Sequence, residues 1–287
     1  MINKNKDKTL IFDVGMHKGE DTNYYLKKGF RVIGFEADPD LVKHCKYRFS
    51  KEIENRKLTI VEGAIVDLHH GEAVGQTVKF YKNKENTEWG TVNVDYANRN
   101  EMLGTHNEII EVNAIDFTES LMQFGIPYYL KIDIEGLDTI CLKSLFNFVQ
   151  KPSYISIEDQ KVTFDILLEE INLFEQLGFT KYQAVQQQFI RFHSSPNHSM
   201  EGISIAYRFQ QGSSGPFGED LPGKWKDKNQ IIEEFKYIYQ QYILFGDSSK
   251  WNRFGAGRFF LRAIARIFRR PMPGWYDIHA KSRSVLP

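Results

Sequence analysis

The chain has 287 residues, 41% of them hydrophobic, with 37 basic and 37 acidic residues. Such a length suits one large domain, or one domain with an appended segment. No apolar run approaches the roughly 20 residues that cross a bilayer, the polar N-terminus lacks the apolar core of a signal peptide, and the zero net charge argues against a dedicated nucleic-acid binder. The two cysteines, Cys45 and Cys141, form neither a metal spacing nor a disulfide framework, so we expect a cytoplasmic location.

Short β-rich runs alternate with helical patterns over the first 180 residues. We expect strands at 9–14, 31–37, 58–66, 109–115, 128–134 and 153–159, and helices at 20–28, 38–50, 116–124, 137–148 and 164–177. Strands that alternate with helices imply βαβ units and a mostly parallel sheet. Near-continuous apolar runs such as "LIFDV" are typical of strands that are covered on both faces.

The segment 71–107 interrupts this alternation. It holds "VKFYKN", which has the period of an edge or hairpin strand, and a polar loop with "EWGTVN". We therefore expect an insertion at the ligand end of the sheet. Further expected elements are strands within 179–193, a Gly/Ser/Pro-rich loop at 212–223 and a helix at 226–245.

The stretch "TLIFDVGMHKGEDT" predicts a strand that ends at Asp13, a turn containing Gly15 and Gly19, and the start of a helix. Glycines let a backbone approach a ligand closely, and a helix start offers N–H groups to an anion. An acid stands where a dinucleotide motif has its first glycine, and it would repel a pyrophosphate. It suits the amino group and sulfonium of S-adenosylmethionine instead. The alternative is a tight turn whose glycines serve only chain reversal.

Glu36 ends the second expected strand, about 20 residues after the glycines, the spacing at which an acid meets the ribose hydroxyls of an adenosine cofactor. The alternative is a surface acid that caps the next helix. Gly63 and Ala64, after the third strand, would then border the adenine. His17, within the glycine turn, could touch the cofactor or the acceptor, but we expect a solvated loop residue.

The stretch "YYLKIDIEG" places Lys131 and Asp133 at the end of a central strand, where charges are costly unless paired. With the strand order usual for methyltransferases, Asp13, Asp133 and Glu158 would meet at the carboxyl ends of three neighbouring strands, with Lys131 as their counter-charge. Alternatively, Asp133 and Glu135 favour the start of the next helix through its dipole.

These motifs resemble the FkbM family of S-adenosylmethionine-dependent methyltransferases. The resemblance rests on "FDVGMHKGEDT", "VIGFEADP", "EWGTVN", "YYLKIDIEG" and "PSYISIE", in the order and spacing of the family. It implies an α/β class I methyltransferase fold, Rossmann-like, with a mostly parallel sheet flanked by helices. It also implies methyl transfer to an oxygen acceptor and a cofactor held by Asp13, Gly15, Gly19 and Glu36.

Methyl transfer from a sulfonium is an in-line displacement, so positioning supplies much of the catalysis. An alcohol must also lose its proton to a base. Our candidates are Asp133 and Glu135, with Glu158 in support and Lys131 as counter-charge. A divalent cation on these carboxylates is another route, although the sequence shows no separate metal-ligand spacing. We expect O-methylation of a sugar or related polar metabolite. The alternatives are a non-catalytic cofactor-binding or membrane-associated module and an NAD-dependent oxidoreductase.

We expect a methyltransferase domain at 1–210 and an extension at 211–287, a loop plus a basic helix that packs on it. From Trp251 to the end the chain carries +7, which leaves −7 for the remainder. Within 253–270, four arginines recur at helical spacing: Arg258, Arg262, Arg266 and Arg269. This amphipathic helix could lie on an anionic membrane surface, but we favour packing on the domain because the opposite charges match.

Overall fold

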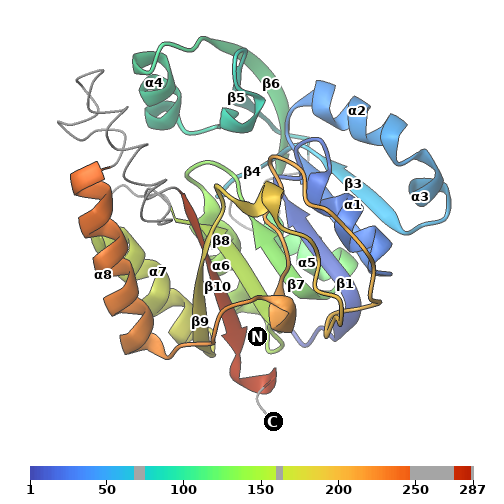
Figure 1. Ribbon diagram of the computed structural model, residues 1–287. Coiled ribbons are helices and arrows are strands. Elements are labelled where there is room, and N and C mark those ends of the chain that lie inside the picture. The colour runs from blue at the N-terminus through green and yellow to red at the C-terminus, as the bar shows by residue number, and fades with distance from the viewer. Residues whose placement is uncertain (68–74, 160–163, 246–274, 286–287) are drawn as a thin grey trace.

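The computed structural model describes residues 1–67, 75–159, 164–245 and 275–285. The expected basic helix at 253–270 lies outside these residues. Seven of the described strands form one sheet in the order β3-β2-β1-β7-β8-β10-β9 (Figure 1). They are β1 (Lys6–Val14), β2 (Arg31–Glu36), β3 (Leu58–Glu62), β7 (Ile126–Ile132), β8 (Tyr154–Glu158), β9 (Phe179–Gln186) and β10 (Tyr276–Ser282). Only β10 runs antiparallel to its neighbours, so the expectation of a mostly parallel sheet is confirmed.

The helices expected from apolar periodicity are also present. They are α1 (Glu20–Lys27), α2 (Pro39–Arg48), α5 (Phe117–Phe124), α6 (Asp138–Ser144), α7 (Phe164–Gln176) and α8 (Lys228–Phe245). Local chemistry sets several starts: Asp38 and Asp116 accept backbone N–H bonds in the first turns of α2 and α5. The helix expected at 38–50 stops at Phe49, and a short helix, α3 (Ser50–Glu54), follows it.

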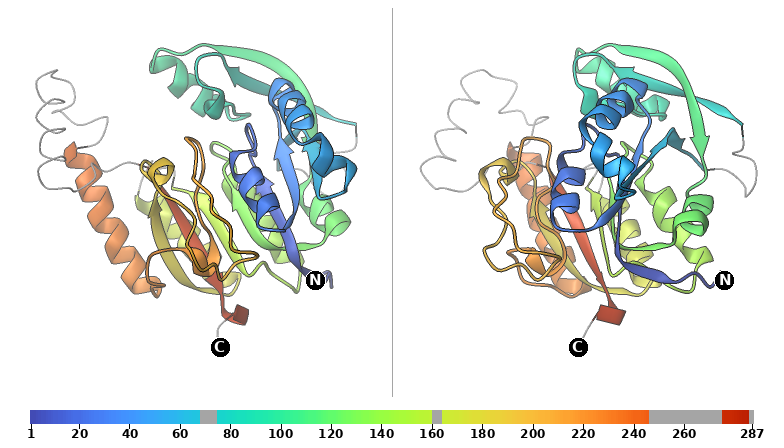
Figure 2. Two further views of the ribbon diagram at one scale, coloured as in Figure 1. Left: turned by 45° about the vertical axis from the view of Figure 1, so that its right-hand side comes forward. Right: turned by 90° about the vertical axis from the view of Figure 1, so that its right-hand side faces the viewer.

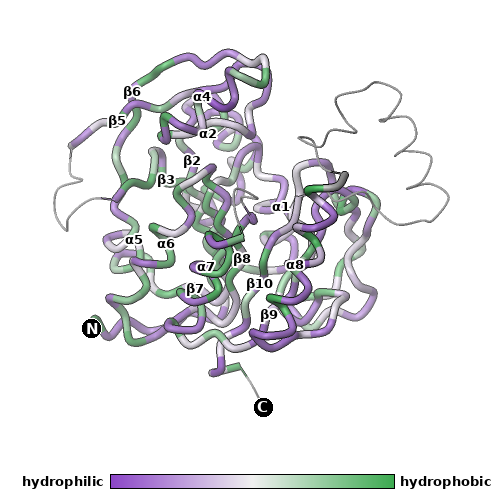
Figure 3. The backbone as a smooth tube through the Cα atoms, turned by 90° about the vertical axis from the view of Figure 1, so that its left-hand side faces the viewer, coloured by the Kyte–Doolittle hydropathy of each residue, from purple (hydrophilic) through white to green (hydrophobic). Residues whose placement is uncertain are grey.

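Two different layers cover the main sheet. Helices α5, α6, α7 and α8 pack on one face around buried aliphatic residues of the strands. The other face carries α1, α2 and the irregular segment 187–227, which contributes Tyr207, Phe209 and Phe217 to a second buried cluster. Hydrophobic stretches follow the strands at the centre of the molecule (Figure 3), as expected for a sheet that is covered on both sides.

The expected insertion forms a small second sheet. It contains β4 (Ala64–Ile65), β5 (Thr77–Asn83) and β6 (Asn107–Ile115) in the order β4-β6-β5, with η1 (Thr87–Trp89) and α4 (Val94–Met102) between β5 and β6. Figures 1 and 2 show it beyond the carboxyl ends of the main-sheet strands. The run at 109–115 was expected in the main sheet, and that expectation is wrong. The antiparallel partner β5 pairs with β6 from Thr77 to Asn83 and holds it in the insertion.

The last strand, β10, lies between β8 and β9 although it comes from the end of the chain. No strand was expected from the sequence over Tyr276–Ser282. Among the described residues, no helix is both long and apolar enough to cross a membrane.

Candidate functional site

A buried lysine is the centre of the site. Lys131, near the end of β7, pairs in register with Asp13 on the neighbouring β1. Its Nζ lies 3.6 Å from Asp13 Oδ1, 3.5 Å from Asp133 Oδ2 and 3.8 Å from Asp21 Oδ2. Burial alone would lower the pKa of Lys131, but the attraction of these carboxylates outweighs it and raises the pKa. The ammonium therefore stays charged.

The sequence predicted Lys131 beside Asp13 and Asp133, and the structure brings these three together. The third carboxylate in the structure is Asp21, in the first turn of α1, whereas Glu158 was expected there. Glu158 ends β8, the next strand along the same edge. It lies opposite Asp277 in the register between β8 and β10.

Asp13 and Asp21 are held differently. Thr22 Oγ1 donates to Asp13 Oδ2 at 2.6 Å, while Asp13 Oδ1 is buried and has no hydrogen-bond partner in the described part of the chain. The backbone N–H of Ser214 donates to both oxygens of Asp21, at 2.9 and 3.0 Å. Burial raises the pKa of both carboxyls, that of Asp21 to about 7, and the charge of Lys131 opposes the shift. Asp21 was not predicted, because its partner Ser214 lies 193 residues further along the chain.

The glycine turn is required by the fold itself. Gly15 has φ of 78°, and a Cβ there would lie 1.9 Å from the backbone oxygen of Asp133. Gly19 also has φ of 78°, precedes α1, and has Phe49 within 2.3 Å of where its Cβ would be. Both positions need glycine for sterics alone. The close packing of this turn therefore requires both glycines, whether or not a ligand binds there.

His17 is not the solvated residue that we expected. Its Nε2 lies 2.8 Å from Thr87 Oγ1 in the insertion, and its Nδ1 lies 3.4 Å from Glu20 Oε2. The side chain therefore ties the glycine turn to η1. The sequence did not predict this contact because the insertion is folded over the turn by distant pairing between β5 and β6.

Glu36 ends β2 and is 8% exposed. Its oxygens accept backbone N–H groups from His17 at 2.8 Å and Asp38 at 2.9 Å, while burial raises its pKa to about 7. Each carboxylate oxygen keeps a second lone pair, so Glu36 can still accept bonds from a pair of neighbouring hydroxyls. Gly63 lies beside it, since its N–H donates to the backbone oxygen of Glu36 at 2.9 Å, and Ala64 follows.

The insertion closes over the loop after β7. The Asp133 side chain is 44% exposed, whereas that of Glu135 is 14% exposed and lies with its Oε2 3.5 Å from an Arg99 guanidinium nitrogen of α4. Thr91 Oγ1 donates to the backbone oxygen of Glu135 at 2.8 Å. Glu135 also has φ of 27°, a strained backbone conformation that costs free energy and is common at functional sites. Asp133 is therefore the more accessible carboxylate.

The donor set does not favour a metal ion. Within the described residues, no group of three or more His, Cys, Asp or Glu side chains is arranged to hold one. The place where Asp13, Asp21 and Asp133 converge is taken by the ammonium of Lys131.

Comparisons with known proteins place the chain in a family. Residues 13–181 match the model of the family described as "Methyltransferase FkbM domain". Similar solved structures include a SAM-dependent methyltransferase from Archaeoglobus fulgidus, at 13% identity and a TM-score of 0.38 over 95% of this chain and 86% of that one. Another is methyltransferase FkbM from Methylobacillus flagellatus KT, at 16% identity and a TM-score of 0.35 over 60% of this chain and 38% of that one.

One curated relative is the ribosomal RNA small subunit methyltransferase A of Campylobacter hominis. It is 34% identical over 73 residues, which are 25% of this chain. The matched part spans 22% of the length of that protein.

Proposed function

Since the chain belongs to the FkbM family of methyltransferases, we propose that it transfers a methyl group from S-adenosylmethionine to an oxygen of a sugar or related polar metabolite. Its α/β fold is that of the class I enzymes that use this cofactor. The observation that carries the proposal is the excess of acids where β1 ends and α1 begins. Asp13, Asp21 and Asp133 share the single ammonium of Lys131, so this edge would repel a pyrophosphate but attract the ammonium and sulfonium of S-adenosylmethionine.

The residues of this edge fit the cofactor. Glu36 would accept the ribose hydroxyls, and Asp13 offers a buried oxygen with no hydrogen-bond partner among the described side chains. The turn of Gly15 and Gly19 would carry the methionine end, and Gly63 and Ala64 would border the adenine. When bound, the cofactor supplies an electrophilic methyl group.

We assign the base to Asp133. Its carboxylate is accessible and lies beside the fixed charge of Lys131, so it can accept the proton of an acceptor hydroxyl that is held against the edge of the sheet. Glu135, which Arg99 engages, and Glu158 on the next strand complete the acidic rim and would orient the acceptor. A divalent cation is not needed for this route.

The location and partners are part of the proposal. A cytoplasmic enzyme is supported by Cys45 and Cys141, which are both buried and unpaired. The acceptor is a small molecule or carbohydrate, with no nucleic acid. The alternative of a membrane-associated module depends on 253–270, which the structure does not describe.

Asp133→Asn tests the proposal because it keeps the shape and removes the charge. Transfer of labelled methyl from S-adenosylmethionine to a panel of sugars and alkyl glycosides should fall at least about 100-fold, the usual scale for loss of a general base. Asp95→Asn, on the exposed start of α4, is the matched control and should keep the wild-type rate. An unimpaired Asp133→Asn enzyme would place the base elsewhere, and loss of the wild-type rate in EDTA would favour the metal route.

A further inference from the structure

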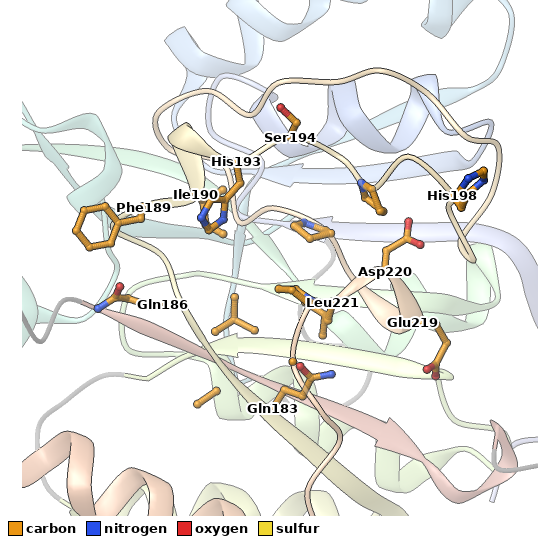
Figure 4. A pocket seen from close by; sticks show the side chains of 16 residues that line it. Gln183, Gln186, Phe189, Ile190, His193, Ser194, His198, Glu219, Asp220 and Leu221 are labelled. Atoms are coloured by element: carbon orange, nitrogen blue, oxygen red, sulfur yellow. The ribbon is translucent and has the colours of Figure 1, made fainter. Parts of the chain in front are cut away.

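A large cavity lies beside the candidate active site, between β9 and the segment 187–223. Its volume is about 1240 Å³, above the range of about 300–1,000 Å³ that is usual for small-molecule sites. Apolar side chains from both walls line much of it: Val185, Phe189, Ile190, Pro216, Leu221 and Pro222 (Figure 4). Its size and lining suit an organic molecule with an extended apolar body.

The carboxylates on the wall of the cavity are already neutralised. Asp220 pairs with the buried Lys28 at 2.7 Å, and Glu219 pairs with Lys281 at 2.7 Å. Neither acid therefore calls for a cationic ligand. A cationic body fits this wall poorly, since its charge would have to be desolvated without a free carboxylate as partner.

Lys131 and the carboxylates around it, Asp13, Asp21 and Asp133, form a group that we call the Lys131 cluster. A row of buried polar residues crosses the sheet from this cluster to the cavity. Strand register places Asp13, Lys131, Ser156, His279 and Gln183 side by side on β1, β7, β8, β10 and β9. His279 is 1% exposed and Gln183 is 3% exposed. Neither ring nitrogen of His279, nor Nε2 of Gln183, has a hydrogen-bond partner in the part of the chain that the structure describes.

Gln183 lines the cavity, and Figure 4 shows its side chain directed into it. A buried amide N–H without an acceptor is costly, so an oxygen atom of a ligand is the partner that this position fits. The cavity is thus apolar around one fixed hydrogen-bond donor.

The same backbone segment borders the cavity and the active site. Ser214 donates to Asp21 of the Lys131 cluster, Pro216 lines the cavity, and a Cβ on Gly215 would lie 2.9 Å from Ile190 of the opposite wall. Gln186, at the carboxyl end of β9, also lies along the edge that carries Glu158. A molecule in the cavity therefore lies next to the edge where methyl transfer is proposed.

We propose that this cavity holds the apolar body of the methyl acceptor. The acceptor is then an uncharged amphiphile: its hydroxyl-bearing end meets Asp133, and its body, which carries an oxygen that accepts from Gln183, fills the cavity. This inference rests on the proposed function and narrows its substrate class from polar metabolites in general to those with an apolar substituent.

Alkyl β-glucosides of increasing chain length are the probe, titrated by calorimetry into the full chain saturated with S-adenosylhomocysteine. Affinity should rise up to about fourfold for each added methylene until the cavity is full. Leu221→Trp should weaken octyl glucoside at least tenfold and leave the affinity for S-adenosylhomocysteine unchanged. Ile203→Trp, at a position that is 58% exposed, is the matched control and should bind like the wild type.

Affinity independent of chain length, or an unchanged affinity in Leu221→Trp, would overturn the inference. If Leu221→Trp does not fold, Val185→Phe makes a smaller intrusion into the same cavity and decides the question in the same way. The cofactor titration separates the two proposals. Failure of S-adenosylhomocysteine to bind the wild type contradicts the proposed function, whereas failure of the glucoside series alone contradicts only the cavity assignment.

Discussion

Burial of the ionised Glu36 carboxyl lowers the free energy of unfolding. Its pKa is raised from 4.5 to about 7. A folded-state pKa above the unfolded value gives a contribution to stability that is complete below about pH 4.5 and is lost as the pH rises through about 7. Such a residue is retained at a cost in stability, as is common in functional sites.

Glu36→Gln should therefore flatten the pH dependence. Urea unfolding should show that the wild type loses more stability than Glu36→Gln between about pH 5 and about pH 8. Glu62→Gln, at the exposed end of the neighbouring strand β3, is the control and should follow the wild type. If the unfolding free energies of the wild type and Glu36→Gln change with pH in parallel, the pKa of the Glu36 carboxyl is not raised in the folded protein.

Lys131 should be the most sensitive charged residue of the site. Lys131→Met leaves Asp13, Asp21 and Asp133 without their shared cation, which should cost about 3–5 kcal/mol of unfolding free energy at about pH 8. The loss should shrink at about pH 5, because Asp21, with a pKa of about 7, then becomes protonated; the raised pKa of Asp13 acts in the same direction.

Lys46→Met is the matched control for urea unfolding. Lys46 pairs with Glu62 on the surface, and removing such a pair should cost only about 0–1 kcal/mol. If Lys131→Met and Lys46→Met lose the same unfolding free energy, the charges around Lys131 are not coupled as strongly as their distances indicate.

Single residues were predictable where neighbouring strands bring them together. Asp13, Lys131 and Asp133 belong to β1 and β7 or to the loop just after β7, and parallel strands present their carboxyl ends at one edge. Asp21 and His17 were not, because their partners, Ser214 and Thr87, reach them through segments without a clear period.

Among the elements, β10 shows why a strand can escape prediction. The run "YDIHAKS" is almost wholly buried, yet it contains Asp277, His279 and Lys281. Apolar and polar residues alternate from Tyr276 to Lys281, which is the period of a strand, but only Ile278 is β-branched, so the run has low strand propensity. Its antiparallel pairing with β8 and β9 joins residues at least 90 positions apart, so no local pattern specifies this pairing.

The expected boundary at residue 210 can be tested through β10. A chain that ends at residue 210 lacks α8 and β10 and leaves β8 and β9 without the strand between them. We expect it to show no cooperative thermal unfolding by circular dichroism. A chain that ends at residue 285 retains β10 and should melt like the full-length protein. Cooperative melting of the shorter chain would instead make 1–210 an independent domain.

On the scale of the whole molecule, the sheet face covered by α5, α6 and α7 was predictable, whereas the opposite face was predictable only where α1 and α2 cover it. Helices α5, α6 and α7 bury apolar residues at helical spacing. The segment 187–227 covers the other face with Tyr207, Phe209 and Phe217, although its only named elements are two short 3₁₀ turns, Ile190–Phe192 and Gly218–Asp220. The cavity and Ser214 belong to this segment, so the sequence indicated a methyl-transfer site but not the shape of its acceptor side.

Calorimetric titration of S-adenosylhomocysteine and of NAD into the wild type and Glu36→Ala tests the proposed activity most directly. We predict that the wild type binds S-adenosylhomocysteine and not NAD. Glu36→Ala should weaken S-adenosylhomocysteine binding on the order of 10- to 100-fold, because it removes charge-assisted bonds to the ribose that contribute about 1.5–3 kcal/mol. Binding of NAD in place of S-adenosylhomocysteine, or equal affinities of the wild type and Glu36→Ala for S-adenosylhomocysteine, would contradict the assignment of this edge as the methyl-donor site.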